Sequence, residues 1–204
     1  MRIITFILAV STCLIVSRCA AQNELAPGEG KYHNFAIYGG VGPSFFFNNL
    51  KTFKNQVNPW GYEFSLRVMW EPEHSFLSLG FETGYYRIYT ANGNVVDSMS
   101  GMQTDAHVSN SSIPLQFVVS MKFSKKIYAN WSMGQSITFN KVSSPGFDTN
   151  HDATTWSLAD FSATIGYRFM QKARISYAAE FKGFYSSSYS NGTIAVLFIV
   201  GYRL

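Results

Sequence analysis

The sequence lacks the long apolar runs that would form membrane-spanning helices. Beyond a short apolar stretch at its start, no segment approaches the roughly 20 consecutive apolar residues that a spanning helix needs. Charged residues make up only 14% of the 204 residues, and the formal net charge is +4. No run of basic residues is present, so the composition does not favour nucleic acid as a partner.

Cysteine is nearly absent as well, and both cysteines, Cys13 and Cys19, lie close to the start of the chain. This part of the chain begins with the positive charge of Arg2, continues through an apolar stretch and ends in small residues, as a secretory signal peptide does. We predict cleavage before Gln22, so that the exported chain contains no disulfide. A lipid anchor on Cys19 is the alternative, and Arg18 argues against it because a small residue normally precedes such a cysteine.

The sequence is rich in aromatic side chains, at 17%, and in segments where large apolar residues alternate with small or polar ones. Such alternation is typical of a β-strand with two different faces. It occurs in eight segments, at 34–46, 60–71, 75–89, 111–123, 127–140, 158–170, 175–185 and 193–204. Short and longer connections alternate between them. The pattern predicts an all-β protein, an eight-stranded antiparallel up-and-down transmembrane β-barrel.

The same observations divide the chain into three parts. We expect residues 1–21 to be a cleaved signal peptide and residues 22–31 to be a flexible N-terminal lead, since the lead contains proline and glycine and has no periodicity. Residues 32–204 have the length of one domain, the outer-membrane β-barrel domain. The expected location is therefore the outer membrane of a bacterial cell.

Side-chain volume indicates which face of the barrel is outside. On one segment Phe64, Leu66 and Trp70 share a parity, while the other parity carries small residues. An eight-stranded barrel is just wide enough inside for side chains to fill it, so it cannot enclose aromatic residues from many strands. We therefore expect the large residues to face lipid, with aromatic girdles at both interfaces. The alternative is a soluble β-sandwich with one wet face.

Charged residues share the inward parity. They comprise five acidic residues, Glu63, Glu71, Glu82, Asp160 and Glu180, and five basic residues, Arg67, Lys122, Arg168, Lys182 and Arg203. A charge in a narrow interior of low dielectric constant needs a partner. We expect these residues to pair across strands and to plug the lumen rather than line a pore. A catalytic or proton-relay role for them is the alternative.

Two polar clusters contain the residue types of nucleophilic catalysis. Asp105, His107 and Ser109 stand at spacing two near the end of a predicted strand. Same-face neighbours on a strand lie about 6.6 Å apart, which is too far for the hydrogen bonds of a catalytic triad. The second cluster consists of Ser143, Ser144, Asp148, His151 and Asp152 in a predicted polar loop. We predict no catalytic residues and no cofactor. We also predict no metal site, because four histidines without exported cysteine are a weak basis for zinc.

Three long connections are the expected binding elements. They are the loops 47–59, 90–110 and 141–156, and in outer-membrane barrels the longer loops face the outside of the cell. Loops on a rigid scaffold often carry binding function. We expect contact with outer-membrane lipid and lipopolysaccharide, an envelope protein partner through these loops, and no nucleic acid.

Several short motifs resemble those of one bacterial family. The segment Ser-Ile-Pro-Leu-Gln-Phe-Val-Val at 112–119 resembles the strand containing Ile-Pro-Leu in the PorT-like outer-membrane β-barrel family of Bacteroidota. Residues 39–45 look like the glycine-rich first strand of that family, and residues 201–204 are similar to its closing strand. Residues 20–22 resemble the usual cleavage site of exported Bacteroidota proteins. The resemblance implies an integral outer-membrane barrel, and only some members of the family are tied to protein secretion.

The function predicted by these patterns is that of a non-enzymatic integral outer-membrane β-barrel protein. It would present extracellular loops and have a structural or partner-binding role in the cell envelope. Two alternatives remain: an accessory subunit of an envelope protein-secretion system, and a lipid A-modifying outer-membrane enzyme.

Overall fold

A computed structural model describes residues 35–47, 57–72, 75–96, 103–143, 151–172, 174–187 and 191–204 of the chain. The strands in order are β1 (Phe35–Phe46), β2 (Val57–Asn58), β3 (Trp60–Trp70), β4 (Leu77–Val96), β5 (Gln103–Lys122), β6 (Ile127–Ser143), β7 (His151–Lys172), β8 (Ile175–Ser186) and β9 (Asn191–Arg203). Within these ranges no helix is long and apolar enough to cross a membrane. The predicted signal peptide, 1–21, and lead, 22–31, lie outside the described residues.

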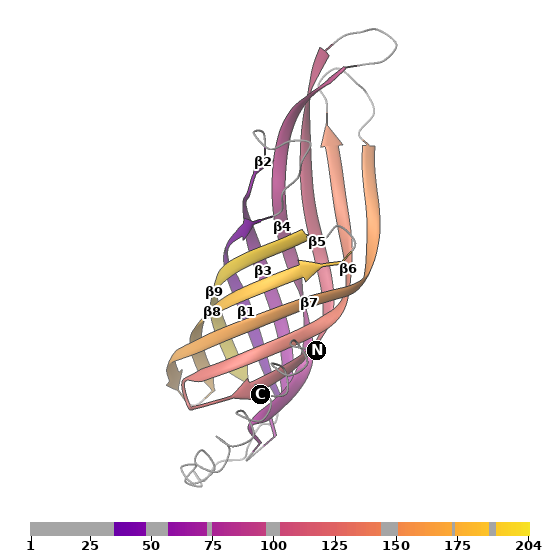
Figure 1. The fold of residues 1–204 in the computed structure, drawn as a ribbon. Coiled ribbons are helices and arrows are strands. Elements are labelled where there is room, and N and C mark those ends of the chain that lie inside the picture. Colours follow the sequence, from indigo (N-terminus) through magenta and orange to yellow (C-terminus); the bar gives the residue numbers. More distant parts are fainter. Residues whose placement is uncertain are drawn as a thin grey trace, which may run out of the picture.

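Eight of these strands close into a barrel (Figure 1). From β3 to β9 each strand pairs antiparallel with the next one along the chain, and β1 pairs with both β3 and β9. β2 is a two-residue strand that pairs with Thr90 and Ala91 of β4. Closure satisfies the backbone hydrogen bonds of the membrane span, where each unsatisfied group would cost several kcal/mol. The predicted eight-stranded antiparallel barrel is confirmed.

The directions of the side chains confirm the predicted inside and outside. On β3, Phe64 and Leu66 are 52% and 42% exposed, whereas Ser65 and Arg67 are buried. The other barrel strands repeat this alternation, with large apolar residues on the exposed face. An apolar exterior around an interior of small and charged residues is suited to lipid rather than to water. The alternative of a soluble β-sandwich is thereby excluded.

Aromatic side chains lie near both ends of this lipid-facing surface. Trp60 and Tyr62 are exposed at the start of β3, and Trp70 is exposed at its end. Tyr167 and Tyr202 are exposed near the ends of β7 and β9, at the same end of the barrel as Trp70. Aromatic rings are favoured where hydrocarbon meets the polar headgroups. Their positions agree with the two predicted girdles.

Inward-facing glycine makes room for two tyrosine rings. A Cβ atom added at Gly166 would lie 2.2 Å from Cζ of Tyr128, and one added at Gly201 would lie 2.4 Å from Cε1 of Tyr38. Each ring therefore occupies space that any other residue would fill with its own side chain. This close approach lets the two tyrosines reach the charged residues of the lumen.

The predicted bounds of the loops 90–110 and 141–156 are wrong, because strands occupy much of both ranges. Residues 90–96 of β4 pair with residues 103–109 of β5, and residues 141–142 of β6 pair with the first two residues of β7. These segments are polar and lack large alternating residues, so they carry no strand periodicity. They are strands because each pairs with a neighbouring strand. The periodicity of side chains along one segment carries no information about such pairing.

The structure describes only parts of the predicted loop 47–59. Val57 and Asn58 form β2, and the N–H of Phe46 donates to the carbonyl oxygen of Pro59 at 2.9 Å. Residues 48–56 lie outside the described ranges, as do 97–102 and 144–150 in the other two predicted loops.

The additional strand length lies on one side, so the barrel wall has unequal height (Figure 1). Pairing between β3 and β4 ends at Arg87, and pairing between β7 and β8 begins at Asp160. Beyond these residues β4, β5, β6 and β7 continue as paired strands, and β2 lies beside Thr90 and Ala91 of β4. The four strands contribute residues 89–96, 103–110, 140–143 and 151–155, which we call the extension.

The outward side chains indicate where the wall leaves the membrane. Along β5 they change from Ile113 to Ser111, and along β6 from Phe139 to Lys141. Ser111 pairs with Phe139, which pairs in turn with Thr154 of β7, so the change from apolar to polar falls at a similar height on three strands. A lipid-facing surface would stay apolar. The extension therefore lies in the aqueous layer.

We expect a charge on the lipid face of β9 to impair assembly according to its depth. Phe198 lies near the middle of β9, Tyr202 lies close to its end, and the two are 47% and 43% exposed. Arginine on a lipid-facing position costs about 2–4 kcal/mol at the bilayer midplane and about 0–1 kcal/mol near an interface. Phe198→Arg should lower the yield of the folded, heat-modifiable gel band more than Tyr202→Arg at matched expression. Equal yields of the two variants would contradict this placement.

Candidate functional site

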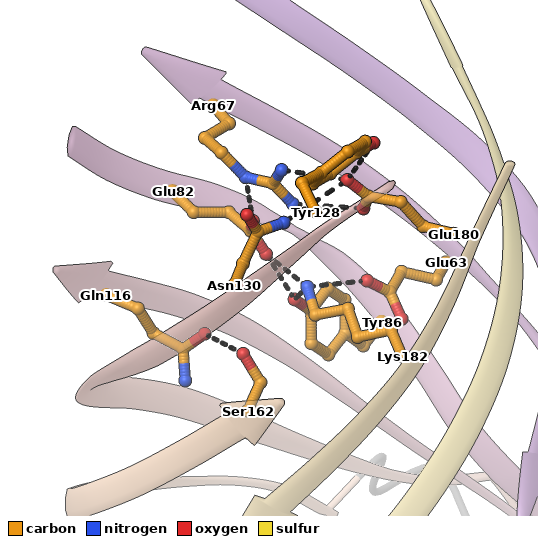
Figure 2. Close-up of polar contacts among 10 residues, drawn as sticks. All are labelled: Glu63, Arg67, Glu82, Tyr86, Gln116, Tyr128, Asn130, Ser162, Glu180 and Lys182. Atoms are coloured by element: carbon orange, nitrogen blue, oxygen red, sulfur yellow. Dashed lines mark hydrogen bonds and ion pairs between the residues drawn. The ribbon is translucent and has the colours of Figure 1, made fainter. Parts of the chain in front are cut away.

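A network of buried ionic side chains fills the middle of the barrel (Figure 2). It contains two cations, Arg67 and Lys182, and three carboxylates, Glu63, Glu82 and Glu180. Each of the five is at most 4% exposed. They come from β3, β4 and β8, and the alternation of each strand turns them inward together.

Arg67 joins strands that are distant in the barrel. Its Nε donates to Oε2 of Glu82 at 2.6 Å, and its Nη1 and Nη2 donate to the two carboxylate oxygens of Glu180 at 3.0 and 3.1 Å. A guanidinium that holds a carboxylate through two parallel hydrogen bonds is a strong and directional pair. Arg67 therefore connects β3 to its neighbour β4 and, through the lumen, to β8.

Lys182 occupies the other half of the network. Its Nζ lies 2.9 Å from Oε1 of Glu63, and it also forms an ion pair and hydrogen bond with Glu82. The same ammonium donates to the hydroxyl of Tyr86 and lies 4.8 Å from the centroid of that ring. Glu82 is thus shared by both cations and links the two halves. A completely buried lysine depends on such carboxylate partners.

Neutral donors add hydrogen bonds to this network, in which carboxylates outnumber cations. The hydroxyl of Tyr128 donates to Oε1 of Glu180 at 2.8 Å, and Nδ2 of Asn130 donates to the same oxygen at 3.3 Å. Nearby, the hydroxyl of Ser162 donates to Oε1 of Gln116 at 3.1 Å (Figure 2). The bonds from Tyr128 and Asn130 supply Glu180 with donors in addition to Arg67.

A second ionic cluster lies at the end of the barrel that carries the tight turns. Oε2 of Glu71 accepts from Nζ of Lys122 at 2.8 Å and from Nη2 of Arg203 at 3.4 Å, and Oε1 accepts from the hydroxyl of Tyr38. Cross-strand pairing of the inward charges is therefore confirmed for eight of the predicted ten. These are Glu63, Glu71, Glu82, Glu180, Arg67, Lys122, Lys182 and Arg203.

The other two inward charges differ from that prediction. Asp160 accepts hydrogen bonds from the hydroxyls of Ser136 and Ser157 and from the N–H of Ser187. Arg168 donates to Oε1 of Gln171 at 3.2 Å, and its guanidinium lies 5.5 Å from the centroid of the Tyr128 ring. Neither forms an ion pair with a described residue. Hydroxyls, an amide and a ring face stabilise these charges, and composition alone does not predict such partners.

The lumen contains little free volume. Towards the extension it is filled by the buried cluster of Phe46, Tyr86, Ile88 and Phe184, in which the rings of Tyr86 and Phe184 meet edge to face at 4.9 Å. Next to Arg67, Glu71 and Lys122 there is a cavity of about 10 Å³, room for about one water molecule. Packed rings and paired charges thus occupy the described part of the lumen.

The described members of the clusters considered for catalysis lie on the extension. Asp105, His107 and Ser109 occupy alternate positions on the outward face of β5, and Nδ1 of His107 lies 2.6 Å from Oδ1 of Asn92 on β4. The extended backbone gives the spacing that keeps the three apart. Ser143 pairs in register with His107 at the end of β6.

The structure does not describe the side chains of the remaining members of the second cluster. Ser144 and Asp148 lie outside the described residues, and His151 and Asp152 are described as backbone at the start of β7. In the part of the chain that the structure describes, no group of three or more His, Cys, Asp or Glu side chains could hold a metal ion.

The closed barrel with an apolar exterior and a filled, charged interior defines an integral outer-membrane β-barrel protein. Two solved structures are similar in fold. Ail, the attachment invasion locus protein of Yersinia pestis, has a TM-score of 0.51 and 13% identity over 85% of this chain and 100% of its own. Neisserial surface protein A, NspA, has a TM-score of 0.51 and 10% identity over 86% of this chain and 100% of its own. At these identities the likeness is one of fold, and this fold belongs to the outer membrane.

No family model matches the chain, and no curated protein matches its sequence. Membership of the PorT-like family of Bacteroidota therefore stays a prediction from the short motifs.

We expect removal of the buried ammonium to destabilise the barrel strongly. Lys182→Met leaves Glu63 and Glu82 without their shared cation, and removal of one partner of a buried pair costs about 3–5 kcal/mol. The free energy of unfolding, measured by urea titration in lipid vesicles, should fall by about this amount. Lys122→Met should cost less, because the Lys122 side chain is 26% exposed and Glu71 keeps Arg203.

A second substitution separates lost charge balance from lost packing. Adding Glu63→Gln to Lys182→Met removes a carboxylate whose ion pair is with Lys182. The double variant should recover part of the lost unfolding free energy. If it is no more stable than Lys182→Met, uncompensated charge is not the cause of the loss.

We expect the filled lumen to block ion flow. In planar lipid bilayers the purified protein should show no large, stable conductance, because Phe46, Tyr86, Ile88 and Phe184 fill the lumen towards the extension and the ion pairs fill its middle. Reproducible openings of porin size would show that the interior opens.

Proposed function

We propose that this protein is a non-enzymatic outer-membrane anchor that presents the extension at the cell surface as a contact surface for a partner outside the cell. The observation that carries the proposal is the height of the β4–β7 wall, which continues beyond the ends of the β3–β4 and β7–β8 pairing. Ordering each additional residue costs conformational entropy. Strand length that serves neither closure nor lipid burial is best explained by a contact made above the membrane.

The lengths of the connections support the placement of the extension outside the cell. The β3–β4, β5–β6 and β7–β8 connections are short and lie at the end opposite to the extension (Figure 1). In outer-membrane barrels the short turns face the periplasm. The extension then faces the surroundings of the cell.

The extension is an ordered sheet with polar outward side chains. On the outward face Asn92 contacts His107 across the β4–β5 ladder, and on the inward face Asn110 and Asn140 are hydrogen-bonded to each other. Asp105 and Lys141 are exposed. A rigid scaffold with such a surface suits a partner held by hydrogen bonds and charge, and it loses little conformational freedom when a partner binds.

Other observations favour a binding role over the alternatives. The filled lumen opposes a channel, and the spacing of Asp105, His107 and Ser109 opposes a triad. By their names, Ail is an attachment invasion locus protein and NspA a surface protein. A surface role for a chain of similar fold agrees with both.

The test is to shorten the extension without disturbing the barrel. Asn92 pairs with His107, so residues 93–106 can be replaced by the two-residue turn Asn-Gly, which suits a hairpin. Cells with either chain are compared for adhesion to a panel of immobilised glycans and proteins, at equal amounts of folded band. We expect adhesion with the full chain and its loss with the shortened chain.

Two results would contradict the proposal. One is equal adhesion, or none, with both chains. The other concerns topology: Ser109→Cys should react with a membrane-impermeant maleimide on intact cells, and Ser176→Cys, in the lumen at the turn end, should not. The reverse labelling pattern would place the extension in the periplasm.

A further inference from the structure

Exposed positive charge is concentrated at the turn end of the barrel. Lys125 and Lys126 lie in the β5–β6 turn, Lys172 ends β7, and Arg174 lies in the β7–β8 turn. All four side chains are exposed, and none forms an ion pair with a described carboxylate. They differ in this from Lys122 and the other paired cations of the lumen. We call the four residues the basic rim.

The β5–β6 turn of the basic rim is held against strand β7. The N–H of Arg168 on β7 donates to the carbonyl oxygen of Lys126 at 2.7 Å. The hydroxyl oxygen of Ser124 accepts from the N–H of Lys126 at 3.2 Å and from that of Ile127 at 3.0 Å. The backbone that carries Lys125 and Lys126 is therefore fixed relative to β7.

Lipid-facing neighbours set the height of the basic rim. Phe123 and Ile127 flank the β5–β6 turn and are 43% and 46% exposed, and Met170 and Ile175 flank the β7–β8 turn at 43% and 41%. These apolar side chains lie on the outer surface of the barrel. The cations are one to four residues away from them, so they lie where the hydrocarbon gives way to the headgroups.

The charge is also one-sided. The described residues of the β3–β4 turn, Glu71, Pro72, Ser75 and Phe76, add no cation. Among the described residues at this end, the exposed cations without an ion pair therefore lie on the β5–β8 side, whereas Arg203 on β9 is paired with Glu71.

We propose that the basic rim binds the negatively charged headgroups of phospholipids in the leaflet that faces the periplasm. Lysine and arginine beside an anionic lipid surface are attracted to it, and the guanidinium of Arg174 can hold a phosphate through two hydrogen bonds. A lipid is favoured over an acidic protein because the flanking apolar residues place the cations at the depth of the phosphates. A headgroup with net negative charge, such as phosphatidylglycerol, is preferred to zwitterionic phosphatidylethanolamine.

The full chain, refolded into vesicles of phosphatidylcholine, provides the test. Spin-labelled phosphatidylglycerol or phosphatidylethanolamine is added, and the fraction of label immobilised at the protein gives the relative association constant. We expect association of phosphatidylglycerol to exceed that of phosphatidylethanolamine several-fold, and this preference to decrease with added salt because the charges are exposed. No preference in the unmodified chain would overturn the proposal.

Substitutions at the basic rim and at a control site test where the preference for phosphatidylglycerol arises. Replacing Lys125, Lys126, Lys172 and Arg174 together by Gln should abolish the preference, while replacing Arg87 and Lys141, which lie towards the other end, should leave it intact. Each variant must show the folded, heat-modifiable band. If the four-site variant does not fold, Lys125→Gln with Lys126→Gln, and Lys172→Gln with Arg174→Gln, should each reduce the preference. The proposal would be overturned if the folded rim variants kept the preference for phosphatidylglycerol, or if only the variant at Arg87 and Lys141 lost it.

Discussion

The constraint on which this structure depends is that every backbone donor and acceptor in the hydrocarbon must find a partner within the protein. Strands meet it only by closing, and the pairing of β1 with β9 closes the barrel. Closure at eight strands then fixes the width of the lumen. That width decides which residues face inward, because the lumen holds the small side chains together with a few rings and charges, and the large apolar ones must face lipid.

The charged interior follows from the same constraint. Closure brings Glu180 of β8 within reach of Arg67 on β3, although 113 residues separate them in the chain. Such a pair is costly to desolvate and costly to break. The shared carboxylate of Glu82 links Arg67 with Lys182, so the network ties β3, β4 and β8 together inside the wall. In this arrangement the paired charges occupy the middle of the lumen, and removing one of them would leave its partner buried without a counter-charge.

The constraint ends where the membrane ends. Above the hydrocarbon, water can hydrogen-bond the backbone, so a sheet no longer has to close. Four strands of this barrel continue into the extension at the level where Ile113 gives way to Ser111 and Phe139 gives way to Lys141. At the opposite end the wall stops in tight turns that bear exposed cations. The two ends therefore present different chemistry to their surroundings, one a polar sheet and the other a basic rim beside lipid.

The sequence by itself determined the class of fold, the lipid-facing parity and the identity of the inward charges. Alternation on a strand such as β3 is a local property, and side-chain volume shows which face fits a narrow barrel. Only the tertiary structure decided which charges pair, because the contact of Arg67 with Glu180 depends on closure and on the register of strands far apart in the chain. It also decided the height of the wall. Residues 90–96 and 103–109 have no apolar alternation, and what makes them strands is pairing with their neighbours.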